Sequence, residues 1–139
     1  MSPAHSGLDL QVLNHAGVYA IGAGDESALA AAMRDAGVLV RRIDLEGVSD
    51  KRTLLARLAA QLDFPAGFGG NWDALADNLR DLAWLRSASG YALFLDRVDA
   101  LRSRGTQEFD TLLGVLDDAS EHWADRDTGF WAFLSSTTP

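Results

Sequence analysis

A small α/β domain built on a parallel sheet is the fold class that this sequence predicts, and three observations predict it. The chain has 139 residues, 47% hydrophobic and 23% charged, which is the balance of one ordinary globular domain. Short apolar or β-branched runs recur along it and predict strands. Helix-period stretches separate these runs, and such alternation favours a parallel sheet with right-handed crossovers. We therefore expect a three-layer-like domain with helices packed on three or four parallel strands.

Four segments have the length and composition of strands: residues 17–22, 38–45, 90–96 and 130–135. The second is β-branched and mostly apolar, and the last two are continuous apolar runs. Because such runs suit strands that are buried on both faces, the last three segments are predicted to be neighbouring parallel strands. The first segment is predicted to add an edge strand, and the helix after it is predicted to cover the sheet.

Capping residues and helical spacing place the helices. Asp25 can cap an alanine-rich helix over 28–36, which Gly37 ends. Ser49 or Asp50 can cap the next helix, whose leucines recur at helical spacing.

Two further helices follow. Asn71 is a suitable N-cap for a helix over 72–82, and Thr106 for a long helix over 106–125. The polar stretch 99–105 between them is predicted to be a loop.

The formal net charge is −8. Such a surface repels phosphate backbones, so we expect no nucleic-acid binding, and it attracts basic partners. The acidity would also suit a protein that is merely soluble. The chain has no cysteine, which fits a reducing cytosol. We expect a cytoplasmic protein, monomeric when free, because the sequence has neither a signal peptide pattern nor an apolar run of membrane-spanning length.

A glycine-rich run at 67–70 directly precedes the helix at 72–82. A phosphate-binding loop in this position usually adds a lysine or arginine. Here Asp73 lies in the first turn instead and would repel phosphate. We therefore expect glycines that allow a tight chain path and the close approach of a partner, and no cofactor.

Three aspartates, Asp73, Asp77 and Asp81, are spaced four residues apart and form one stripe on the predicted helix. Like charges at this spacing cost a few tenths of a kcal/mol each, so the stripe does not stabilise the helix. The helix dipole accounts for Asp73 in the first turn but poorly for Asp81 near the other end. The stripe is thus a candidate binding surface, with a solvated helix face as the alternative.

The predicted helix at 106–125 carries six acidic residues and no lysine or arginine. Solvated helix faces usually mix charges of both signs. A basic partner, or the general acidity of the protein, would explain this bias equally well.

Catalytic arrangements are sparse. His5, His15 and His122 are scattered and lack metal-ligand spacing. Paired carboxylates can serve glycoside hydrolysis or hold a divalent metal, but such sites need a concave cleft. We therefore expect no enzyme, no metal and no cofactor. The four tryptophans are expected in the core or at its rim, where any of them could anchor an interface: Trp72, Trp84, Trp123 and Trp131.

The segment FPAGFGGNWDALADNLRDL, at 64–82, resembles the barstar family of small intracellular ribonuclease inhibitors. The shared pattern is an apolar residue and proline, then aromatic-Gly-x-Asn, then x-Asp-Ala-Leu-x-Asp-x-Leu. The resemblance covers about 38–136. It implies a single barstar-like domain over 1–139, with a loose tail at 1–8 and a β-α extension at 9–37.

The resemblance also implies a function and its residues. Barstars plug the active site of a basic ribonuclease, and their acidic residues stand in for substrate phosphate. By position, Asp73 and Asp77 match the binding aspartates, and Phe68, Gly69 and Asn71 match the binding loop.

A further acidic contact on the later helix falls on Asp118, with Asp117 as the rival. The family has aromatic residues at three positions where this chain has none: Gly67, Ala76 and Leu82. These departures imply a different ribonuclease bound in the same mode. Ala76 stays within the predicted surface, and either Trp72 or the N-terminal extension supplies the missing aromatic contact.

A ribonuclease inhibitor is therefore the function that the sequence favours. The first alternative is an interaction module or immunity protein of barstar fold, directed at another basic toxin or protein. A carboxylate-dependent hydrolase is the distant alternative.

Overall fold

The computed structural model describes residues 15–86 and 88–137, so the predicted tail at 1–8 lies outside it. The elements in chain order are β1 (Gly17–Ala20), a 3₁₀ turn (Ala23–Asp25), α2 (Glu26–Asp35), β2 (Val38–Asp44), α3 (Lys51–Gln61), α4 (Trp72–Leu79), β3 (Gly90–Asp96), α5 (Asp99–Arg104), α6 (Thr106–Ala124) and β4 (Gly129–Leu134). Among the described helices, none is both long and apolar enough to cross a membrane.

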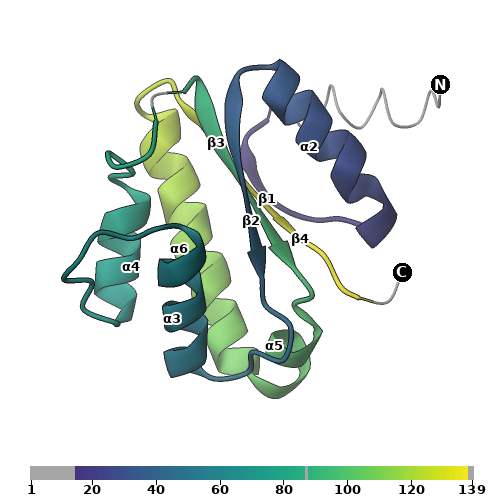
Figure 1. Ribbon diagram of the computed structural model, residues 1–139, viewed down its shortest axis with the longest axis vertical. Helices are drawn as coiled ribbons and strands as arrows, with labels where there is room; N and C mark the ends of the chain where they lie inside the picture. The colour runs from purple at the N-terminus through teal and green to yellow at the C-terminus, as the bar shows by residue number, and fades with distance from the viewer. Residues whose placement is uncertain (1–14, 87, 138–139) are drawn as a thin grey trace.

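The sheet has four strands in the order β1-β4-β3-β2, and every neighbouring pair is parallel. Helix α2 covers one face, and α3, α4 and α6 cover the other (Figure 1). The prediction that β2, β3 and β4 are parallel neighbours is confirmed. The predicted edge strand is β1, which pairs with β4 over Gly17–Ala20.

The strands are buried on both faces because their side chains alternate between two apolar clusters. In β3, Leu93 and Leu95 belong to the larger cluster with α3, α4 and α6. Ala92 and Phe94 belong to the smaller cluster beneath α2. Since both faces of a strand need apolar residues in such a sandwich, the period-2 pattern of a half-exposed strand is lost. The continuous apolar runs of the sequence are the result.

The prediction of a loop at 99–105 is wrong, because Asp99–Arg104 forms α5. Asp99 lies in its first turn and two arginines lie in its last turn, so the charges suit the helix dipole. Leu101 is the buried side chain of α5. Six residues with one buried position are too few for hydrophobic periodicity to reveal a helix.

Helix boundaries also differ from those expected. Of the two predicted caps for α3, Ser49 and Asp50, the structure has Asp50, which accepts a hydrogen bond from the backbone N–H of Thr53 at 2.8 Å. Asp25 stands at the N-cap of α2 but makes no side-chain capping bond. For α6 the N-cap position belongs to Gly105 rather than to Thr106.

Gly105 is required by packing. A Cβ at this position would lie 2.3 Å from the carbonyl oxygen of Ser49, a backbone atom that cannot move cheaply. We expect Gly105→Ala to lower the free energy of unfolding by about 1–3 kcal/mol, the usual cost of overpacking. Urea denaturation followed by circular dichroism measures this change.

The matched control is Gly114→Ala, on the exposed side of α6, where an added Cβ would meet nothing within 4 Å. Because alanine is the better helix former, this change should stabilise the protein by about 0.5–1 kcal/mol. Equal effects of the two substitutions would contradict the packing argument.

Candidate functional site

Helix α4 packs against the larger core cluster by one face. Leu75 and Leu79 are fully buried there, and Trp72 packs at its rim. At its start the side chain of Asn71 accepts a hydrogen bond from the backbone N–H of Ala74 at 2.7 Å, which makes Asn71 the N-cap. This cap fixes where the helix begins and therefore which residues face outward.

The loop before α4 has a path that glycine makes possible. Gly67 and Gly70 have φ angles of 95° and 67°, in the left-handed region that favours glycine. Between them, the Phe68 ring packs edge-on against Phe64, with ring centroids 5.0 Å apart. Phe64 in turn meets the ring of Trp84. The aromatic contacts hold the loop to the domain while most of its residues stay exposed.

Asp73 and Asp77 project from the outer face of α4 into solvent. The Asp77 side chain is 73% exposed, and its Oδ1 accepts a bond from Nη2 of Arg80 at 2.7 Å. The predicted three-residue stripe is only partly formed, because α4 ends at Leu79 rather than at residue 82. Asp81 therefore lies beyond the helix, and Leu82 has a φ of 55°. Two aspartates, not three, share the helix face.

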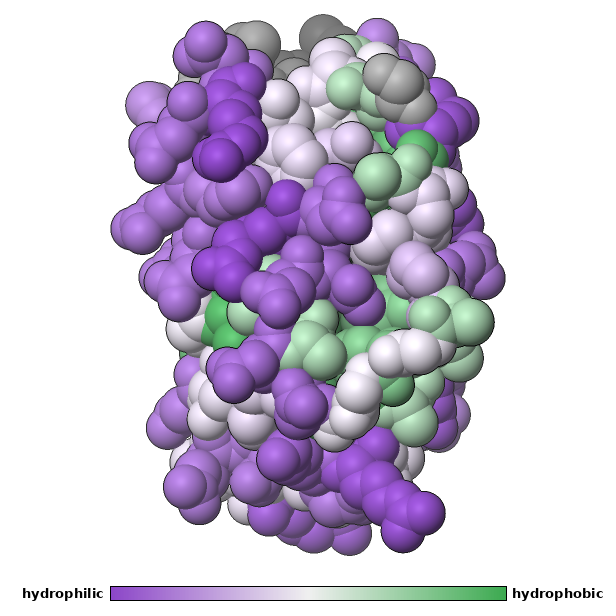
Figure 2. Space-filling view, turned by 90° about the vertical axis from the view of Figure 1, so that its left-hand side faces the viewer, coloured by the Kyte–Doolittle hydropathy of each residue, from purple (hydrophilic) through white to green (hydrophobic). Residues whose placement is uncertain are grey.

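A shallow hollow of about 190 Å³ lies between the loop and α4 and brings Phe68, Gly69 and Asp77 together. The other predicted residues of this segment surround or support it. Asn71 uses its carboxamide oxygen for the cap, and Trp72 turns inward to the core. Ala76 is half-buried on α4. Seen from the side that carries α4 and its loop, apolar surface lies about the middle of the face, bordered by hydrophilic side chains (Figure 2).

Helix α6 lies beside α4 and is tied to it by Trp123. The indole Nε1 of Trp123 donates to the backbone carbonyl of Leu79 at 2.8 Å, at the end of α4. Sequence reasoning missed this contact, because the need of a buried indole for an acceptor does not say which carbonyl supplies it. The bond satisfies a carbonyl that the end of α4 leaves without a helical partner, and it keeps the acidic helices adjacent.

Asp117 and Asp118 are both exposed on α6, but they point to different sides. Asp117 follows Leu113 by one helical turn, and Leu113 lines a groove beside β1. Asp118 is the next residue, about 100° further round the helix, on a different side from Leu113. Neither aspartate lines the hollow, so the choice between Asp118 and Asp117 stays a prediction.

A second cluster of charges, which sequence reasoning missed, lies where the strands end. Ligands of open α/β sheets commonly bind outside the carboxyl ends of the strands. Here Glu26, whose side chain is 8% exposed, pairs with Arg42 at this edge. Arg42 also lies 3.9 Å from a carboxylate oxygen of Asp96, and Arg97 pairs with Asp44. The arginines are thus engaged by carboxylates, which would oppose the binding of phosphate.

The two strand-end aspartates have pKa values that shift in opposite directions. The hydrogen bond from Arg97 lowers the pKa of Asp44 below its ordinary value. Burial raises the pKa of Asp96, and one of its oxygens is buried without a hydrogen-bond partner in the structure. Within the described residues, no group of three or more His, Cys, Asp or Glu side chains is arranged to hold a metal ion.

Comparison with known families identifies the family to which this chain belongs. The model of the family described as Barstar (barnase inhibitor) matches residues 38–135, more than half of the chain. The chain belongs to the barstar family. The match includes the whole acidic helix and its loop, and it leaves the first 37 residues of this barstar-family protein outside. No curated protein matches it.

Solved structures share the fold at low identity. The ORC2 protein of Aeropyrum pernix, solved as ADPNP-ADP complexes, is 15% identical with a TM-score of 0.62, and the match covers 97% of this chain and 40% of that one. Drosophila ORC bound to DNA is 14% identical with a TM-score of 0.50, covering 96% and 75%. This barstar-family chain thus spans less than half of the ORC2 protein. At such identities the likeness concerns the fold alone.

The departures from the family pattern now have a structural context. Gly67 adopts a left-handed conformation that disfavours a side chain, and Leu82 is buried in the core. Neither position presents an exposed aromatic ring. The outward surface of this barstar-family protein is therefore less aromatic at these two positions than the family pattern implies.

Loss of the α4 cap is expected to destabilise the fold. Replacing Asn71 by Ala leaves the N–H of Ala74 without its acceptor and should lower the free energy of unfolding by about 1 kcal/mol. Asn71→Ser, which keeps a capping oxygen, should change it little. Chemical denaturation of the three proteins provides the measurement, and equal losses in both variants would disprove the cap.

The Asp44–Arg97 pair predicts a pH dependence of stability. Because the folded-state pKa of Asp44 is lowered, its contribution is present above the ordinary aspartate pKa of about 3.9 and is lost as the pH falls through the folded-state value. In Asp44→Asn this carboxylate is absent. The stability difference between the two proteins should therefore be largest above about pH 5 and shrink toward pH 3. A difference that stays constant across this range, in urea melts, would contradict the assignment.

Proposed function

We propose that this barstar-family protein inhibits a basic ribonuclease by binding across its active site. The single observation that carries the proposal is Asp77, which is 73% exposed on a helix whose opposite face is buried in the core. The fold thus fixes the position of the Asp77 carboxylate, although this carboxylate makes no contact with the core. Such a group suits a cationic pocket that normally receives phosphate.

The pairing of Asp77 with Arg80 does not oppose this role. Both side chains are exposed, and surface pairs of this kind contribute about 0–1 kcal/mol. A cation in a desolvated enzyme pocket offers a stronger interaction. A cation of the partner can therefore replace Arg80 as the ion-pair partner of Asp77. Asp73 adds a second acceptor one turn earlier on the same face.

The negative charge of the protein would attract a basic target over a long range, which supports the proposal. The chain has a formal net charge of −8, and exposed acids line α6 beside the acidic helix. Such a surface raises the rate at which a positively charged enzyme arrives, and salt reduces the effect. In this mechanism the protein occludes a site and performs no chemistry. We further propose that it acts in the cytoplasm as a monomer when free.

Removing the Asp77 carboxylate separates binding from folding. In Asp77→Ala the midpoint of thermal unfolding should hardly change, because surface substitutions usually alter stability by about ±0.5 kcal/mol. Truncating one side of a buried charge pair costs about 2–5 kcal/mol of binding, a general range measured on complexes that include barnase with barstar. We therefore expect binding to weaken at least ~30-fold.

Thermal melts and stopped-flow binding measure the two effects, first with barnase and then with basic ribonucleases that co-purify with the chain. Asp35→Ala is the control, because it removes the same charge from exposed α2 on the other face of the sheet. It should leave the dissociation rate unchanged. If Asp77→Ala binds as tightly as the parent but unfolds early, the carboxylate is structural. Capture of only non-nuclease proteins would favour another target.

A further inference from the structure

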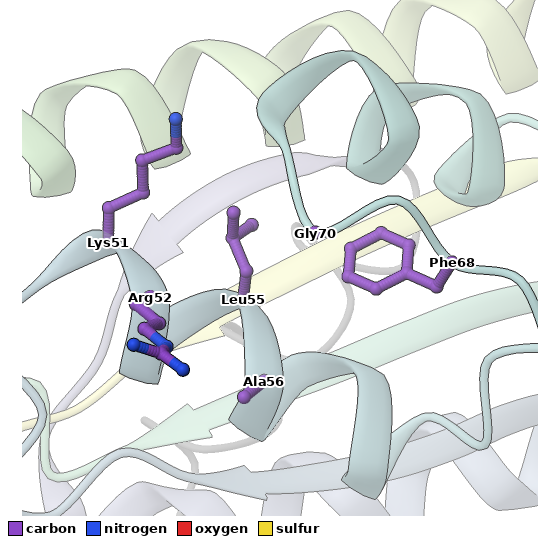
Figure 3. Close-up of a pocket in the computed structure, with 6 residues that line it drawn as sticks. All are labelled: Lys51, Arg52, Leu55, Ala56, Phe68 and Gly70. Atoms are coloured by element: carbon purple, nitrogen blue, oxygen red, sulfur yellow. The ribbon is translucent and has the colours of Figure 1, made fainter.

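A second groove lies beside the proposed inhibitor surface, which consists of the outer face of α4 and the loop before it. The proposed function gives this groove no role. It has a volume of about 570 Å³ and lies between the first half of α3 and the loop before α4. Lys51, Arg52, Leu55 and Ala56 line it from α3, and Phe68 and Gly70 line it from the loop (Figure 3). Its size is that of sites that hold a small ligand or one or two side chains.

The groove has an apolar part and a basic end. Exposed Ala56 and the edge of Leu55, which is otherwise buried in the core, form one wall. The half-buried ring of Phe68 projects from the loop toward them. Space beside Gly70 is open, because a Cβ there would meet nothing within 4 Å. The positive charges of Lys51 and Arg52 lie at the start of α3, at one end of this apolar surface.

Local stability does not account for these two cations. The first turn of a helix disfavours positive charge, by about 0.3–1 kcal/mol for an exposed residue. Asp50 offsets Arg52 only in part, since its carboxylate is engaged chiefly by Thr53. Among the described residues, Lys51 and Arg52 form no salt bridge with a carboxylate. In a protein of net charge −8, two such cations beside an apolar groove form a distinct surface.

Phe68 connects the groove to the inhibitor surface. It lines both this groove and the hollow that contains Asp77. Helix α3 has three basic residues and no acid, whereas α4 has two acids, so the charge reverses across the loop. A partner that meets both sides must be basic opposite α4 and acidic opposite α3.

We propose that this groove is a second contact for the protein partner and receives an apolar side chain followed by a carboxylate. The apolar group would fill the space between Leu55 and Phe68, and the carboxylate would face Lys51 and Arg52. This inference rests on the proposed function, because the partner is the ribonuclease bound by α4. The reversal of charge across the loop then fixes the orientation of the partner.

A matched pair of substitutions on α3 tests the proposal. Ala56→Glu places a carboxylate inside the groove, where it narrows the space and repels an acidic partner group. Ala60→Glu adds the same charge one turn further along α3, at an exposed position that does not line the groove. In stopped-flow binding to barnase and to the co-purified ribonuclease, Ala56→Glu should weaken affinity at least ~10-fold and Ala60→Glu less than ~2-fold, where tenfold corresponds to about 1.4 kcal/mol.

The outcomes separate this inference from the proposed function. If Asp77→Ala weakens ribonuclease binding but Ala56→Glu acts no differently from Ala60→Glu, the groove is not a contact and the inhibitor assignment stands. If both Asp77→Ala and Ala56→Glu weaken binding, the proposal is supported. Binding of no ribonuclease at all overturns the proposed function.

In that last case a peptide titration decides the chemistry of the groove. The probes are acetyl-Leu-Glu-Glu-amide and its controls acetyl-Leu-Lys-Lys-amide and acetyl-Gly-Glu-Glu-amide, followed by ¹H–¹⁵N NMR. Only the first should shift the amides of 51–56 and 68–70, and Lys51→Gln with Arg52→Gln should weaken it at least ~5-fold. Equal shifts from all three peptides, or none at these residues, would overturn the assignment.

Discussion

The burial of β3 and β4 on both faces is the constraint on which the rest of the structure depends. These central strands carry apolar side chains toward α2 on one side and toward α3, α4 and α6 on the other. Neither cluster can form unless helices cover both faces. Helix α4 is part of that cover, because Leu75 and Leu79 are fully buried in the larger cluster. The position of the acidic helix thus follows from the needs of the sheet.

Helix α4 is short, and its two ends are held by different bonds. Asn71 caps the first turn, and Trp123 of α6 donates to the carbonyl of Leu79 in the last. Two turns of helix would be marginal alone, so tertiary packing supplies most of their stability. A helix held in this way loses little conformational freedom when a partner binds. Preorganisation of this kind favours tight binding through exposed carboxylates.

Charge is distributed unevenly over the molecule, in three regions: the strand ends, the outer faces of α4 and α6, and the start of α3. Carboxylates and arginines neutralise one another at the strand ends, where Glu26 and Arg42 are paired. On the outer face of α4, Arg80 pairs with Asp77, and α6 carries acids without a lysine or arginine. The start of α3 carries cations against its own dipole. The first arrangement is neutralised by pairs within the chain, whereas the other two leave like charges on the surface.

The sequence by itself determined the sheet and the outward face of the acidic helix. Buried parallel strands leave continuous apolar runs, and a capped helix with buried leucines fixes which residues face outward. Asp73 and Asp77 were therefore identifiable as surface acids from the sequence alone. The excess of acids on α6 is likewise visible in the sequence. Local patterns of this kind depend only on residues that are near one another along the chain.

Only the tertiary structure decided where α4 ends and that 99–104 is helical. Each of these depends on contacts between distant segments, such as Trp123 with Leu79 and Leu101 with the core. The strand-end ion pairs and the groove beside Phe68 have the same origin, because they join side chains from separate elements. The sequence pattern of one helix or strand indicates which of its residues can be buried. It does not indicate which other helix or strand packs against it. The end of α4, the helix at 99–104, the strand-end ion pairs and the groove all depend on that packing.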